Sequence, residues 1–198
     1  MWDQLFADLE NVREDATVDL VGTVIDRHFG STALDSRTAV TFLDLFASST
    51  GTTQLVRVLS CLQQRGLELD VYLASTALVA CRRSSDSSTA LDILQEMTAR
   101  HVELNTITYG AAVSACASGG KWAKALSLLV DMVSACVELN TITYSAAVSA
   151  CASGGEWARA LGLLDQMSSA HVELNTITYS AAVSACGKGG AWAQAFGV

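Results

Sequence analysis

Apolar residues recur with helical spacing through the second half of the chain. One stripe consists of Tyr109, Ala112, Val113 and Cys116. These residues lie at i, i+3, i+4 and i+7, which predicts a helix of about three turns. Gly119-Gly120 then favours a turn. Helical spacing resumes at Trp122, Ala125, Leu126, Leu129 and Met132. The pattern predicts a helical hairpin.

The hairpin is one unit of an internal repeat. The sequence Asn-Thr-Ile-Thr-Tyr begins at Asn105, Asn140 and Asn175, in two steps of 35 residues. Comparison of 106–140 with 141–175 shows 27 identities in 35 positions. The same register predicts diverged units at 36–70 and 71–105, two regular units at 106–140 and 141–175, and a truncated fifth unit at 176–198. These units follow an acidic segment, residues 1–35, which we expect to be a divergent helical cap or a partial repeat.

The predicted fold class is all-α, an α-solenoid of stacked helix-turn-helix repeats. The chain contains no proline, so no residue imposes the fixed φ that interrupts a helix. A single 35-residue hairpin cannot bury both of its faces, and it must stack on its neighbours. Because the fifth unit stops at Val198, we expect its first helix to keep an uncovered apolar face that favours self-association.

The net charge of −8 argues against binding of nucleic acid by bulk electrostatics. The acidity is concentrated at the N-terminus, because residues 1–35 carry eight acidic and two basic side chains. No apolar run is long enough to span a membrane, so no membrane partner is expected. Residues 1–35 are acid-rich and do not resemble a transit peptide.

The sequence shows no pattern typical of an enzyme, a metal site or a cofactor site. Its six cysteines form no Cys-x-x-Cys pair. Four of them, Cys81, Cys116, Cys151 and Cys186, share one repeat position on the apolar stripe, which favours core packing. His101 and His171 occupy a position where another unit has Cys136, which argues against catalysis. We expect the three tryptophans that begin second helices, Trp122, Trp157 and Trp192, to pack between helices.

The 35-residue period resembles the pentatricopeptide repeat, as do Thr-Tyr near the start of each unit, Gly before the second helix, and Ala-Leu and Met within it. The near-identical units are similar to organellar arrays and to those of dinoflagellate algae. The resemblance implies binding of single-stranded RNA, one base per repeat, in organelle RNA processing or stabilisation. It also implies a chloroplast or mitochondrial location, with the cytoplasm as the alternative.

In that family, the fifth residue of the first helix and the last residue of the unit read the base. Here the corresponding pairs are Val40 with Asp70, Ser75 with Asn105, Gly110 with Asn140, and Ser145 with Asn175, while Ser180 has no partner. The resemblance implies that Ser with Asn favours adenine. The second residue of each unit would pack on the base face, which nominates Tyr72, Ile107, Ile142 and Ile177. Arg83 and Lys188 at the thirteenth position would lie near phosphates.

Two alternatives remain open. Asn105, Asn140 and Asn175 stand directly before predicted helices, where Asn is also a good N-cap. The solenoid could instead bind proteins as tetratricopeptide arrays do, with a peptide in the same groove, and the acidic charge favours that alternative.

Overall fold

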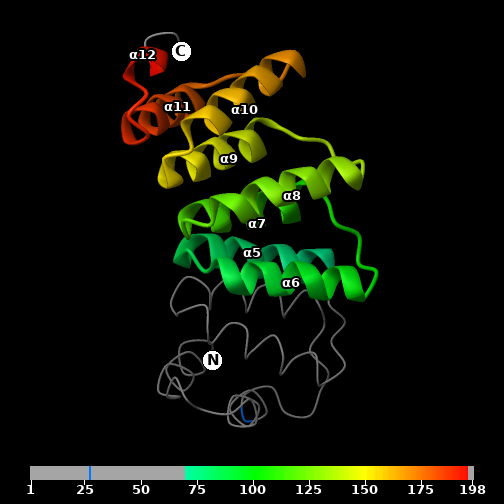
Figure 1. Ribbon diagram of the computed structural model, residues 1–198. Coiled ribbons are helices and arrows are strands. Elements are labelled where there is room, and N and C mark those ends of the chain that lie inside the picture. The colour runs from blue at the N-terminus through cyan, green and yellow to red at the C-terminus, as the bar shows by residue number, and fades with distance from the viewer. Residues whose placement is uncertain (1–26, 28–69, 196–198) are drawn as a thin grey trace.

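The computed structural model describes Arg27 and residues 70–195, and Figure 1 shows the stack of hairpins. Residues 70–195 form eight α-helices and no strand. They are α5 (Val71–Ser84), α6 (Ser87–Ala99), α7 (Thr106–Ser118), α8 (Trp122–Ser134), α9 (Thr141–Gly154), α10 (Trp157–Ser169), α11 (Thr176–Lys188) and the short α12 (Trp192–Ala195). The predicted all-α solenoid is confirmed. The expected cap at 1–35 and the unit at 36–70, with Val40, lie outside the described residues apart from Arg27 and Asp70.

The hairpins stack so that first helices pack on first helices. We call α5, α7, α9 and α11 the A helices, and α6, α8 and α10 the B helices. Each A helix packs against the next A helix along the stack, and each B helix packs against its own A helix and the following one. The A helices therefore form one continuous layer, and the B helices form a second layer that packs against it.

Small side chains allow the A helices to approach closely. Ala77, Ala112 and Ala147, which occupy one repeat position, are fully buried, as are all four cysteines of the apolar stripe. The cysteines were expected in the core, and this is confirmed. Burial raises the pKa of the Cys81 thiol to about 12 and that of Cys151 to about 11. These thiols therefore pack as small apolar groups.

The tryptophans join one hairpin to the next. Trp122 and Trp157 are partly buried and pack against the core, as expected. The Arg159 guanidinium also lies over the Trp122 ring, 5.1 Å from its centroid. Trp192 differs, because 63% of its surface is exposed. The packing expected for Trp192 is therefore only partial.

Candidate nucleic-acid interface

A row of exposed apolar side chains follows the A-helix layer. The second residue of each A helix is largely exposed: Tyr72 at 75%, Ile107 at 65%, Ile142 at 65% and Ile177 at 66%. The next residue in each helix is buried, so these side chains point away from the core. Single exposed apolar residues are normal on protein surfaces, but a row repeated in every hairpin is typical of a binding surface.

The asparagines at the ends of the units cap the A helices. The Asn105 side-chain oxygen accepts hydrogen bonds from the backbone N–H groups of Ile107 and Thr108, both at 3.0 Å. Asn140 and Asn175 each accept one from the third helical residue, at 3.0 Å and 2.9 Å. Since a backbone N–H can only donate, the oxygen of each amide must face the helix.

Capping leaves half of each amide available. Among the described residues, the Nδ2 groups of Asn105, Asn140 and Asn175 donate no hydrogen bond. Each Asn side chain is half-buried at the edge of the A layer. The two sequence interpretations are therefore compatible, because the oxygen serves as the cap while the amino group remains a free donor.

The fifth residues have different surroundings despite their common repeat position. The Ser75 hydroxyl donates to the Tyr72 carbonyl oxygen of its own helix at 2.9 Å. Gly110 is buried, and a Cβ there would lie 3.3 Å from the Thr143 methyl group. Ser145 is also buried, and its hydroxyl lies 2.7 Å from the Thr178 hydroxyl of the next unit. Ser180 on α11 is exposed.

A groove brings the second, fifth and last residues of one unit together. Its volume is about 190 Å³, and it is lined by Val79, Arg82, Thr106, Ile107, Gly110, Ala111, Ser114, Asn140 and Ile142. Two exposed isoleucines from successive A helices thus flank a space that also contains Gly110 and Asn140. The groove combines apolar walls with an amide donor, as planar heterocyclic ligands require.

Arg82 is a groove residue that the sequence analysis missed. It lines the groove, whereas Arg83 and Lys188, the predicted phosphate-proximal residues, are exposed and do not line it. Arg82 lies seven residues after Ser75, which is about two helical turns, so both occupy the same helix face. This seven-residue spacing from an expected base-reading position is the feature of the sequence that could have predicted Arg82 as a groove residue.

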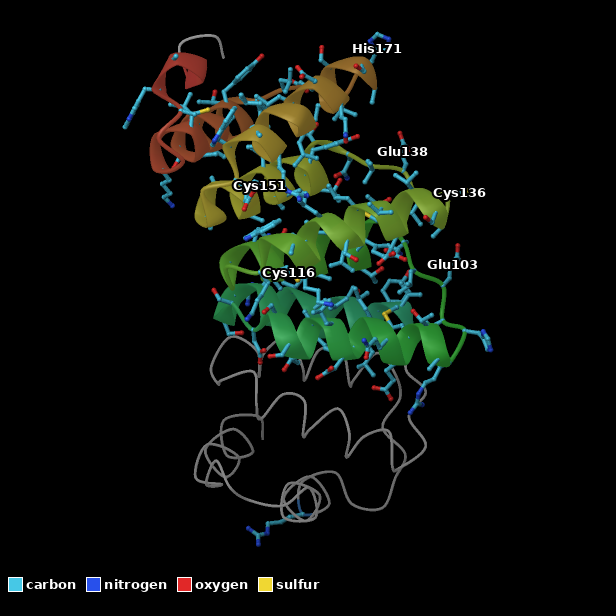
Figure 2. The ribbon with its side chains drawn as sticks, in the orientation of Figure 1. Glu103, Cys116, Cys136, Glu138, Cys151 and His171 are labelled. Carbon is cyan, nitrogen blue, oxygen red and sulfur yellow. The ribbon has the colours of Figure 1, made fainter. Side chains whose placement is uncertain are left out.

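Charge is distributed unevenly between the two layers. The four A helices contain no acidic residue, and they carry Arg82, Arg83 and Lys188. The acidic side chains of residues 70–195 all lie in B helices, at helix caps or in connecting segments. Glu103 and Glu138, for example, project from the connections at one edge of the stack (Figure 2). The net charge of −8 therefore says little about the A-helix surface.

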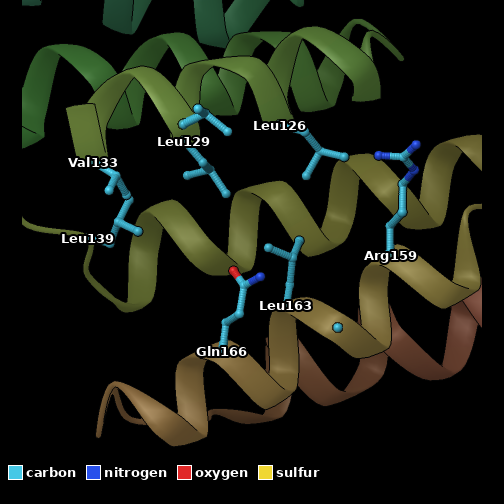
Figure 3. A pocket seen from close by; sticks show the side chains of 9 residues that line it. Leu126, Leu129, Val133, Leu139, Arg159, Leu163 and Gln166 are labelled. Atoms are coloured by element: carbon cyan, nitrogen blue, oxygen red, sulfur yellow. The ribbon is translucent and has the colours of Figure 1, made fainter. Parts of the chain in front are cut away.

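A second groove lies in the B layer, between α8 and α10 (Figure 3). Its volume is about 380 Å³, and Leu126, Leu129, Val130, Val133, Leu139, Arg159, Gly162, Leu163 and Gln166 line it. Val130 and Val133 are 65% and 61% exposed. At the matching positions of the next unit the chain has Asp165 and Ser168, so this apolar surface is specific to one hairpin.

The comparison with protein families agrees with the repeat geometry. A family described as the pentacotripeptide-repeat region of PRORP matches residues 63–198. The chain belongs to this pentatricopeptide repeat family. A comparison with curated protein sequences finds no match.

Solved structures of pentatricopeptide proteins share the fold. The nuclear proteinaceous RNase P 2 (PRORP2) of A. thaliana matches with a TM-score of 0.66 at 15% identity, over 78% of this chain and 35% of that one. PPR10 from maize, in complex with an 18-nt psaJ RNA element, matches with a TM-score of 0.57 at 21% identity, over 100% of this chain and 30% of the PPR10 chain. The PPR domain of Arabidopsis thaliana PRORP1, in complex with tRNA, matches with a TM-score of 0.61 at 14% identity, over 90% of this chain and 92% of that domain. The chain thus spans about a third of the PRORP2 and PPR10 chains.

Within the described part of the chain, no three or more His, Cys, Asp or Glu side chains are grouped so that they could hold a metal ion. His101 and His171 are exposed on connecting segments. No helix in the same region is long and apolar enough to cross a membrane.

Proposed function

We propose that this pentatricopeptide chain binds single-stranded RNA along its A-helix layer, with one base per hairpin. The observation that most strongly supports this proposal is the groove between Ile107 and Ile142, where Gly110 and Asn140 also lie. Exposed isoleucines on successive hairpins suit stacking on the two faces of a base. The RNA complexes of PPR10 and the PRORP1 repeat domain support this assignment by similarity.

The asparagine at the end of each unit supplies the polar base contact in this proposal. Its Nδ2 is a donor without a partner among the described residues, next to the exposed apolar row. An amino group can donate to the ring nitrogen or carbonyl oxygen of a base edge. We propose Ser75/Asn105 and Ser145/Asn175 as adenine-favouring pairs. Arg82 and Arg83 contribute the phosphate attraction, with Lys188 at the far end.

The proposed function is RNA binding alone, and it includes no catalytic step. An organelle location, in the chloroplast or mitochondrion, and a task in processing or stabilising transcripts complete the proposal. Both rest on the family resemblance.

The decisive experiment separates capping from base contact. Asn105→Ser/Asn175→Ser keeps a side-chain oxygen for the helix N-terminus, removes the amide donor and adds no charge that would repel the RNA backbone, so helix stability should be retained. Fluorescence anisotropy with labelled oligoadenylate should then show affinity lower by about tenfold, a loss of two hydrogen bonds. Oligouridylate and duplex probes test base and strand selectivity. Unchanged adenine affinity in a folded double variant would refute base contact by these asparagines.

The B-layer groove favours a second candidate function, contact with another protein. Val130→Asp/Val133→Ser gives α8 the residues found at the matching positions of α10. These substitutions should leave RNA affinity unchanged, because the groove that they alter contains no A-helix residue. RNA affinity that falls in this variant as far as in the asparagine variant would contradict assignment of RNA to the A layer.

A further inference from the structure

Ser145, Thr178 and Asn175 form a chain of hydrogen bonds across two hairpins. The Ser145 hydroxyl lies 2.7 Å from the Thr178 hydroxyl. The Thr178 hydroxyl in turn lies 2.8 Å from the Asn175 side-chain oxygen. Thr178 is fully buried, and Ser145 is 8% exposed. The fifth and last residues of one unit are therefore connected through the third residue of the next A helix.

The number of hydroxyl hydrogens available fixes which group donates in each of these hydrogen bonds. The Asn175 oxygen also accepts a hydrogen bond from the Thr178 backbone N–H at 2.9 Å. An amide oxygen only accepts, so the Thr178 hydroxyl must donate its one hydrogen to Asn175. Ser145 must then donate to Thr178. The Ser145 hydrogen is consequently used inside the protein, and the Asn175 amino group remains directed away from the helix.

From this arrangement we infer that Ser145 is a positioning residue that acts on the base through Thr178 and Asn175, and that Thr178 determines the base selectivity of this hairpin. The inference rests on the proposed RNA binding and gives its fifth-position residue a different role, as an indirect contributor. Thr178 holds the amide oxygen from a second direction, which limits rotation of the Asn175 side chain and orients its donor.

The neighbouring hairpins lack this connection. Ser75 donates to the Tyr72 carbonyl oxygen, and the Thr108 hydroxyl donates to the Asn105 carbonyl oxygen at 2.9 Å. Gly110 has no hydroxyl to offer Thr143. The Thr143 hydroxyl lies 2.8 Å from the Asn140 carbonyl oxygen and farther, 3.3 Å, from the Asn140 side-chain oxygen. Identical Asn caps are thus held differently, and the indirect contribution is specific to the Ser145 hairpin.

A double-mutant cycle tests the inference. Ser145→Ala, Thr178→Val and their combination are compared with the wild-type chain, and the readout is the ratio of affinities for oligoadenylate and oligocytidylate of equal length. We expect each single variant to lower the ratio about threefold or more, as the loss of one hydrogen bond implies. We expect the double variant to lower the affinity ratio no further than either single variant, because both substitutions break the same series of hydrogen bonds. Thr178→Ser, which keeps the hydroxyl, should retain the wild-type ratio.

Additive effects of Ser145→Ala and Thr178→Val would overturn the inference and leave RNA binding intact, because Ser145 would then contact the base directly. A Thr178→Val ratio equal to wild type would overturn it as well. A wild-type chain that binds no single-stranded RNA would refute the proposed function itself. Circular dichroism melting checks that each variant is folded, and Thr178→Ala replaces Thr178→Val if the valine variant does not fold.

Discussion

The indole ring of Trp122 lies directly against the Cα of Gly154 in the next hairpin, so closely that a Cβ at residue 154 would be 2.4 Å from the indole Cδ1. Trp157 has the same relationship to Gly189, again at 2.4 Å. The absence of a side chain at the end of an A helix therefore determines how closely successive hairpins stack.

We expect Gly154→Ala to lower the free energy of unfolding by about 1–3 kcal/mol, because the rigid indole must shift out of a packed site. Gly162→Ala is the matched control, since nothing lies within 4 Å of a Cβ there and α10 continues through it. The control should be neutral or stabilising by about 0.5–1 kcal/mol. Thermal melts followed by circular dichroism measure both, and equal melting temperatures would contradict the assigned contact.

The end of the A layer should promote self-association of the 198-residue chain. Tyr179 and Val183 are 39% and 43% exposed, whereas Tyr144 and Val148 at the same repeat positions are 5% and 0% exposed. Light scattering during size-exclusion chromatography should show a mass that rises with concentration. Val183→Lys should reduce this rise, because it places a charge on the apolar face. Ser184→Lys, at an exposed neighbouring position, serves as the control, and a chain that is monomeric at all concentrations would contradict the prediction.

Thiol reactivity should distinguish Cys136 from the other described cysteines. Cys136 is exposed, whereas the four cysteines of the apolar stripe are buried. In a Cys61→Ser background, a chromogenic disulfide reagent should therefore react rapidly with one thiol in the native chain and with five after unfolding. Additional replacement of Cys136 by Ser should remove the rapid phase. A rapid phase that persists would show that the A layer opens readily.

Alkaline pH should destabilise the fold through its buried thiols. Burial, assisted by Asp86, raises the pKa of Cys81 from 9.0 to about 12, and burial raises that of Cys151 to about 11. Above pH 9 the unfolded chain releases these protons while the folded chain retains them, so stability falls as pH rises toward 11 or 12. Each thiol contributes at most about 1.4 kcal/mol per pH unit.

Melting temperatures between pH 8 and pH 10.5 measure this effect. Cys81→Ala should flatten the decline, although it lowers stability at pH 8 by removing a buried sulfur. Cys136→Ala should leave the decline unchanged, because that side chain is exposed. Identical declines in all three chains would exclude a contribution from Cys81.

The sequence by itself determined the helical hairpin, the 35-residue step and the family, because these follow from local spacing that repeats in the printed chain. It also placed Cys81 in the core and the second-position residues in one row. It left the asparagines divided between capping and base contact. The structure shows capping by the oxygen and leaves the amino group free, a division that no residue pattern contains.

Only the tertiary structure separated residues of the same type at the same repeat position. Ser75 bonds to its own helix, while Ser145 bonds to the following hairpin. It also placed Arg82 in the groove and left Val133 exposed beside α10. The physical reason is that periodicity assigns a residue to a face of its helix, whereas its hydrogen-bond partner depends on which atoms the adjacent hairpin brings within about 3 Å.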